Sequence, residues 1–240
     1  MGETVSPSRR SDLRVRAASA AVMIFVAGAA LSLGGVALLL FVALMCIGLL
    51  SEWWGLVRRI APRPGARLAW MAGGLLYIGA AGVSLIGMPA ALRWVIILAV
   101  IAVDTGAYFS GRRFGERKIA PSISPSKTWA GLYGGMAGAA LVLGSAWLVL
   151  ARALSALAPN RPSMFDAIAS FPLALLAALL LGCLLAILAQ AGDFFESWMK
   201  RCAGVKDSGA LIPGHGGLFD RVDGLIPVAI AAGIVSSVWA

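Results

Sequence analysis

The sequence is poor in charged and metal-binding residues. Of its 240 residues, 11 are Asp or Glu, three are Cys and one is His, and charged residues make up 13% of the chain. A soluble domain has about a quarter of its residues charged. The single histidine, His215, and three widely separated cysteines without metal-type spacing argue against a zinc enzyme and against a disulfide framework.

What is abundant is apolar sequence. Hydrophobic residues make up 60% of the chain, its mean hydropathy is +0.89, and they form runs too long for a soluble core. The net charge of +9 is therefore interpreted as a sign of topology and of contact with anionic lipid head groups. We expect membrane lipids as partners and no nucleic acid.

The apolar runs predict an all-α, polytopic transmembrane helical bundle with about seven spans. The uncharged run at 17–50 would form a helix of roughly 50 Å. A membrane core is about 30 Å thick. We therefore split this run near 32–35 into two short spans. The other spans are expected near 67–88, 93–111, 128–152, 170–190 and 222–240.

The basic residues orient these spans. With the amino terminus in the cytoplasm, all but three of the 20 Lys and Arg residues fall inside; the exceptions are Arg93, Arg152 and Arg161. We expect a multi-pass protein of a bacterial-type inner membrane, with the polar segments described below at its cytoplasmic face. Residues 8–13 resemble a twin-arginine export signal, but the apolar run continues past a cleavage site at 27–29, which favours an uncleaved first helix. The predicted domains are a basic cytoplasmic tail (1–16), amino-terminal transmembrane helices (17–92) and a catalytic transmembrane domain (93–240).

The scarce acidic residues are unevenly placed. Five of the eleven fall between positions 193 and 223, in one cytoplasmic segment. Glu52, which ends the second span beside two tryptophans, is interpreted as an interfacial anchor. Asp166 belongs to a predicted outside loop, 153–170, with no evident chemistry. Asp104 lies within a span, where an ionisable group is costly and is either functional or hydrogen-bonded between helices.

Two upstream features accompany this segment. On a helix, Asp104, Tyr108 and Gly111 share one face. The loop at 112–128 ends in Ser126, Lys127 and Thr128 and leads into the next span. A helix start with free backbone donors, hydroxyls and a lysine can hold phosphate. The alternative is that Thr128 or Ser126 caps the helix and Lys127 only marks the inside.

The segment at 190–223 combines acids, cations and glycines. If the sixth span continues as a helix, it carries one polar stripe: Asp193, Glu196, Ser197, Lys200 and Arg201. Asp220 and Asp223 follow at i and i+3. Mg²⁺ binds carboxylates together with substrate phosphates, cations balance phosphate charge, and glycines admit backbone donors. A magnesium–nucleotide site is favoured over a solvated loop, which would not explain this concentration.

The same segment resembles the signature of the phosphatidate cytidylyltransferase family. Four blocks occur in order: Ser-x-x-Lys-Arg at 197–201, Lys-Asp-Ser-Gly at 206–209, Pro-Gly-His-Gly-Gly at 213–217 and Asp-Arg-x-Asp at 220–223. The stretches at 104–108 and 124–129 also look like the family, so the match covers about 100–240. Ala130 departs from a position that is often Glu or Gln, and Ser126 also differs.

The resemblance implies a reaction in which phosphatidic acid attacks CTP, giving CDP-diacylglycerol and pyrophosphate. It implies Mg²⁺, with room for a second cation, bound by Asp193, Asp220 and Asp223. The implied catalytic residues are Asp193, Lys200, Arg201, Lys206, Asp207, His215, Asp220, Arg221 and Asp223. The implied substrate and phosphate contacts are Asp104, Ser124, Lys127, Thr128, Glu196, Ser197, Gly216 and Gly217.

Other interpretations remain open. A prenol or dolichol kinase, or a cytidylyltransferase for another lipid phosphate, would use the same nucleotide. A cation transporter would distribute charges through several spans toward both faces, whereas this sequence concentrates them on one side. The glycine-rich stretch at 131–135 permits close helix contacts and, with them, a homodimer.

Overall fold

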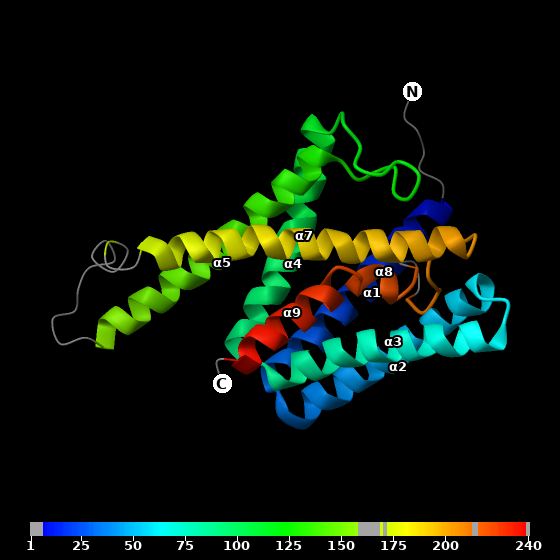
Figure 1. The fold of residues 1–240 in the computed structure, drawn as a ribbon, viewed down its shortest axis with the longest axis horizontal. Helices are drawn as coiled ribbons and strands as arrows, with labels where there is room; N and C mark the ends of the chain where they lie inside the picture. The colour runs from blue at the N-terminus through cyan, green and yellow to red at the C-terminus, as the bar shows by residue number, and fades with distance from the viewer. Residues whose placement is uncertain (1–6, 158–168, 170–171, 213–215, 239–240) are drawn as a thin grey trace. The chain divides into compact units, whose positions relative to one another are not determined.

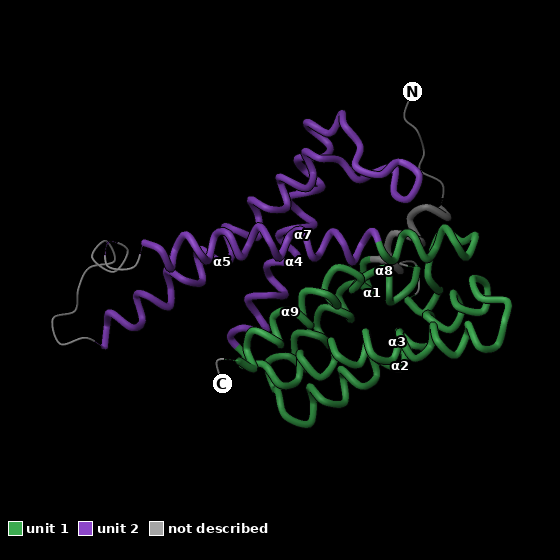
Figure 2. Tube along the Cα trace, in the orientation of Figure 1, with its two compact units in different colours: residues 1–90, 195–240 green, residues 91–194 purple. Residues whose placement is uncertain are grey.

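The chain folds into long helices. A computed structural model describes residues 7–157, 169, 172–212 and 216–238, and these residues form helices and no strand. Figure 1 follows the helices along the chain, and Figure 2 divides the chain into two compact units. Unit 1 contains residues 1–90 and 195–240, and unit 2 contains residues 91–194.

The helices confirm the predicted fold class. Five are long and apolar enough to cross a membrane: α2 (Gly35–Ile60), α3 (Pro64–Gly87), α4 (Ala90–Phe114), α5 (Trp129–Leu157) and α7 (Pro172–Cys202). The apolar part of α1 (Pro7–Leu33), Ala17–Leu33, and helix α9 (Leu225–Val238) are shorter. Each of the predicted spans overlaps one of these helices. The chain is thus a multi-pass membrane protein, while the span count and the orientation stay predictions.

The long first apolar run breaks where predicted. Helix α1 ends at Leu33 and α2 begins at Gly35. Gly34 and Gly35 have φ of 65° and 49°, the left-handed region that glycine adopts without steric cost. This pair of glycines therefore ends one helix and allows the next to start in a new direction.

Unit 1 is packed around aromatic side chains. Helix α2 packs against α3, and α3 packs against α9 (Figure 1). Trp53 of α2 is 2% exposed and donates its Nε1–H to the Trp70 carbonyl at 2.9 Å. Its ring lies against Tyr77, Phe195 and Phe219. Because a Trp N–H needs a partner when buried, this bond fixes the tryptophan within the cluster.

Unit 2 is packed through small residues. A Cβ on Gly106 of α4 would overlap the Gly134 carbonyl of α5, and a Cβ on Gly182 of α7 would overlap the Ala140 backbone of α5. The helix backbones therefore approach too closely for any larger residue. Such contacts are typical of helices that associate within a membrane.

Large apolar side chains cover the outside of several helices. Leu76 of α3 is 73% exposed, Leu141 of α5 is 69% exposed and Leu173 of α7 is 77% exposed. A water-soluble monomer rarely leaves so much apolar surface exposed, whereas lipid tails accept it. These faces agree with the membrane assignment.

Candidate functional site

Among the described residues, polar side chains gather in both units, and several of the predicted site residues lie in these two clusters. The cluster in unit 1 surrounds Lys200, and the cluster in unit 2 surrounds Lys127.

Lys200 of unit 1 joins two blocks of the signature. Near the end of α7, its Nζ lies 2.5 Å from Glu196 Oε2, one helical turn earlier, and 2.6 Å from Asp220 Oδ1. Asp220 belongs to the short helix α8 (Phe219–Val222). The Glu196 side chain is 1% exposed, so this carboxyl group is buried beside the Lys200 ammonium. Helix α7 continues past residue 190 to Cys202, which is the condition on which the polar stripe was predicted.

Asp220 is held by several donors at once. Its Oδ2 accepts hydrogen bonds from the Ser208 N–H at 3.0 Å, the Ser208 hydroxyl at 2.9 Å and the Gly217 N–H at 3.0 Å. Burial alone would raise the pKa of Asp220. Side-chain interactions with Glu196 and Lys200, the Ser208 N–H and the lysine charge outweigh burial and lower this pKa to about 2. Asp220 is therefore ionised at neutral pH, in one fixed orientation.

The interpretation of Glu52 as an interfacial anchor is wrong. Glu52 is 5% exposed. It accepts hydrogen bonds from the Leu218 N–H at 2.9 Å, the Phe219 N–H at 2.8 Å and the Ser208 hydroxyl at 3.1 Å. A buried carboxylate with three donors is part of the interior, not of the head-group region. The sequence did contain one signal for this role, because acids are scarce in the chain and costly within an apolar run.

The other predicted residues of unit 1 surround this cluster. Gly216 and Gly217 lie in the segment before α8, and a φ of 81° at Gly216 requires a glycine there. Ser197 and Asp223 are half-buried, and Asp223 Oδ1 accepts the Gly224 N–H at 2.8 Å. The exposed residues of the predicted set are Arg201, Lys206, Asp207 and Arg221. His215 lies outside the described residues, as does Asp166.

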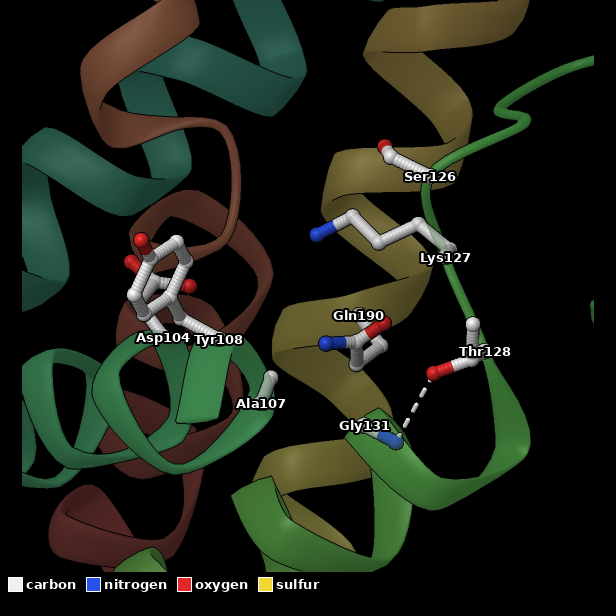
Figure 3. A pocket seen from close by; sticks show the side chains of 8 residues that line it. All are labelled: Asp104, Ala107, Tyr108, Ser126, Lys127, Thr128, Gly131 and Gln190. Atoms are coloured by element: carbon white, nitrogen blue, oxygen red, sulfur yellow. Dashed lines mark hydrogen bonds between the residues drawn. The ribbon is translucent and has the colours of Figure 1, made fainter. Parts of the chain in front are cut away.

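Unit 2 contains a cavity of about 290 Å³. Figure 3 shows Asp104 and Tyr108 of α4 on one side, Ser126, Lys127 and Thr128 on the other, and Gln190 of α7 between them. The remaining lining residues are Ala107 and Gly131. Gln190 is 4% exposed, so its amide is buried at the cavity wall. Asp104 and the 126–128 segment therefore line one cavity.

Lys127 forms an ion pair with Asp193 of α7. The Lys127 side chain is 26% exposed and that of Asp193 16%. Since this pair is half-buried beside a cavity, an incoming anion can compete with Asp193 for the ammonium. Lys127 thus provides an accessible positive charge in unit 2.

Of the two alternatives for the 124–128 segment, the capping role of Thr128 is confirmed, and phosphate binding stays a prediction. Thr128 Oγ1 accepts the Gly131 N–H at 3.0 Å, so Thr128 caps the start of α5 as the capping interpretation predicted. Ser124 is 7% exposed, and its carbonyl accepts the Lys127 N–H at 3.3 Å. Ser126 instead is exposed and lines the cavity. The segment is therefore both a helix cap and a wall of the cavity.

The predicted metal ligands belong to both units. Asp193 lies in unit 2, and Asp220 and Asp223 lie in unit 1. Within the part of the chain that the structure describes, no three His, Cys, Asp or Glu side chains form a group that could hold a metal ion by themselves. Fewer protein ligands than three are common for Mg²⁺, which takes one or two carboxylates and completes its shell with phosphates and water.

Comparison with known proteins identifies relatives for most of the chain. Residues 86–239 match the cytidylyltransferase family. A phosphatidate cytidylyltransferase of Brucella suis is 38% identical over 177 residues, which span 71% of this chain and 58% of the relative. A phosphatidate cytidylyltransferase of Rickettsia felis is 34% identical over 191 residues, 78% of this chain and 75% of that protein. One of Haemophilus influenzae is 44% identical over 134 residues, 56% of this chain and 41% of the relative. The chain thus spans little more than half the length of the Brucella protein.

Proposed function

This chain belongs to the cytidylyltransferase family, and from that premise we propose that it transfers CMP from CTP to phosphatidic acid, giving CDP-diacylglycerol and pyrophosphate. The three relatives described above are phosphatidate cytidylyltransferases, which supports this choice of acceptor.

One arrangement carries the proposal. Lys200 Nζ lies 2.6 Å from Asp220 Oδ1, while Ser208 and Gly217 bind the other oxygen of the same carboxylate. These four residues come from the four separate blocks of the signature. A buried, ionised carboxylate beside a lysine and several backbone donors can bind a cation and stabilise charge that develops on phosphate.

In the proposed reaction, a phosphate oxygen of phosphatidic acid attacks the α-phosphorus of CTP. A new oxygen–phosphorus bond forms, and the bond between the α-phosphorus and the bridging oxygen breaks. Pyrophosphate leaves with that electron pair. Because the attacking phosphate is already ionised at neutral pH, the protein mainly positions the reactants and stabilises charge.

In unit 1 we assign Asp220 as a Mg²⁺ ligand, supported by Asp223. The hard carboxylate oxygens fit this cation, and the low pKa of Asp220 keeps it ionised. Mg²⁺ would supply charge neutralisation for the phosphates. Lys200 orients Asp220, and we propose that its ammonium also contacts a phosphate oxygen of the substrate. The remaining cations proposed to contact phosphate are Arg201, Lys206 and Arg221.

In unit 2 we assign Lys127 to a substrate phosphate and Asp193 to a cation. If a phosphate takes the place of Asp193 at Lys127, the Asp193 oxygen that contacts Lys127 would become available to a cation. Ser124 and Thr128 support the segment through its backbone and its cap, and Asp104 lines the cavity. We propose an inner-membrane location with both clusters accessible from the cytoplasm, where CTP is present.

The direct test is an assay of the purified full chain with radiolabelled CTP, phosphatidic acid and Mg²⁺, with and without chelator. We expect a labelled lipid and pyrophosphate, both abolished by the chelator. Absence of labelled lipid, under conditions where a known cytidylyltransferase is active, would refute the proposal.

A further inference from the structure

Glu52 is buried among residues of the signature, although it belongs to a different part of the chain. It lies in α2, outside the stretch at 86–239 that matches the family. Both of its oxygens are used, Oε1 by the Leu218 N–H and Oε2 by the Phe219 N–H and the Ser208 hydroxyl. The three donors belong to the segment that precedes Asp220, of which the structure describes residues 208–212 and 216–219.

The same segment also binds Asp220. Ser208 contributes its N–H and its hydroxyl to Asp220 Oδ2, and the Gly217 N–H is the third donor. A hydroxyl has only one proton to donate. The Ser208 hydroxyl therefore serves either Glu52 or Asp220 at a given moment, while backbone N–H groups keep both carboxylates in place. The two carboxylates are coupled through one short segment.

Two glycines let the backbone of this segment approach Glu52 closely. A Cβ on Gly209 would overlap Glu52 Oε1, far inside van der Waals distance. A Cβ on Gly217 would lie 2.8 Å from Glu52 Oε2 and 2.8 Å from Asp220 Oδ2. The backbone at both positions thus approaches the carboxylates more closely than any residue with a side chain allows.

We propose that Glu52 is a positioning residue for the transfer reaction: it fixes Ser208 and the backbone at 218–219 so that the Asp220 carboxylate keeps its orientation toward Lys200. The hydrogen bonds of Glu52 go to Ser208, Leu218 and Phe219. Glu52 therefore acts on Asp220 through these residues and does not contact the substrate itself. This inference rests on the proposed function. It makes the amino-terminal helices part of the catalytic unit and not only a membrane anchor.

The test compares Glu52→Gln with the wild-type chain in detergent. The amide keeps the volume of the side chain, but its NH₂ group faces a backbone N–H and cannot accept that bond. Loss of a residue that orients a metal ligand typically lowers metal affinity or activity by about 10–100-fold. We expect kcat to fall by that factor while the KM for CTP changes less than about threefold, since binding groups are unaffected. The matched control is Glu116→Gln, the same change at an exposed residue of unit 2, which should retain wild-type kcat.

Hydrogen exchange gives a readout that does not depend on activity. In Glu52→Gln, peptides covering 208–224 should exchange faster, and peptides from α3 should exchange as in the wild type. Unchanged exchange in 208–224, or a kcat within twofold of wild type, would overturn the proposal. Faster exchange spread evenly over the chain would also overturn it, because Glu52 would then have only a structural role.

A second variant covers the case in which Glu52→Gln does not fold. Gly209→Ala leaves Glu52 intact but displaces its carboxylate, and it should give the same kcat loss and the same local exchange. If the wild-type chain itself makes no labelled lipid, the proposed function fails. In that case faster exchange confined to 208–224 still supports the positioning role of Glu52, and unchanged exchange refutes it.

Discussion

Both units contain a lysine paired with an aspartate, but the two pairs differ in how firmly they are held. In unit 1 the Lys200 side chain is 13% exposed and contacts two carboxylates, and Asp220 accepts three further hydrogen bonds. In unit 2 the Lys127 side chain is 26% exposed, contacts Asp193 and faces a cavity of about 290 Å³. The Lys200–Asp220 pair of unit 1 is thus held by many contacts, whereas the Lys127–Asp193 pair of unit 2 is open to competition from an anionic ligand.

This difference suggests a division of tasks. A carboxylate held by many fixed donors needs no reorganisation during a reaction, which is what electrostatic stabilisation requires. A half-buried lysine beside a cavity can exchange its partner for a ligand phosphate at little cost. We therefore expect changes in unit 1 to lower kcat and changes at Lys127 to raise KM.

The largest effect is expected from Asp220→Asn in unit 1. The amide removes the negative charge but keeps an oxygen that can accept the Ser208 N–H, so the variant should remain folded. Loss of a preorganised electrostatic group costs about 10²–10³ in kcat. Steady-state assays with labelled CTP measure this.

The control for that change is Asp166→Asn, because Asp166 has no proposed role and falls in the predicted outside loop. Its kcat should match the wild type. A kcat for Asp220→Asn near that of the control would contradict the assignment of Asp220 and remove the contrast between the two units.

The next largest effect is expected from Lys127→Ala in unit 2. Removing a charge-assisted contact to phosphate costs about 1.5–3 kcal/mol, or about 10–100-fold, and this should appear in the KM for substrate. The matched control is Lys118→Ala, an exposed lysine of the same loop that does not line the cavity. A loss of kcat at unchanged KM would mean that Lys127 stabilises the transition state, as proposed for unit 1, and would contradict a role in substrate binding alone.

A smaller effect is expected from Gly106→Ala, which tests the packing of unit 2. A Cβ there would overlap the Gly134 carbonyl, so α4 and α5 must separate, at a cost of about 1–3 kcal/mol. Thermal unfolding in detergent should show a lower Tm. Gly79→Ala in α3, where a Cβ meets nothing within 4 Å, should leave the Tm unchanged or raise it. An equal fall in Tm in both variants would show that the close approach of helix backbones at Gly106 does not contribute specifically to the stability of unit 2.

The smallest effect is expected in the pH dependence of stability, through Asp220 of unit 1. The pKa of Asp220 is about 2 in the folded protein against an ordinary value of 3.8, so the unfolded chain binds more protons in this range. Stability contributed by Asp220 is therefore present above about pH 3.8 and is lost as pH falls toward 2. The Tm difference between the wild type and Asp220→Asn should be constant near neutral pH and shrink over that window. A difference that shrinks already between pH 7 and 5 would contradict the low pKa.

Much of the candidate site was predictable because its residues are close in the sequence. The polar stripe on the end of α7 follows from helical spacing, whereas only the structure shows that Asp104 and Lys127 line one cavity. Glu52 was misinterpreted because the aromatic residues beside it are typical of a membrane interface. In the structure Trp53 is instead buried against Trp70 and Phe219.

The sequence by itself determined the fold class, the break between the first two helices and the segment that carries the family signature. Run length fixes whether a helix can span a membrane, glycines at 34 and 35 permit a left-handed backbone, and the signature blocks are contiguous. The tertiary structure alone decided which groups meet: Lys127 pairs with Asp193, and Glu52 binds Ser208 and Leu218, which lie 156 and 166 positions away. Local periodicity describes one helix face at a time, whereas contacts at such separations depend on how several helices pack.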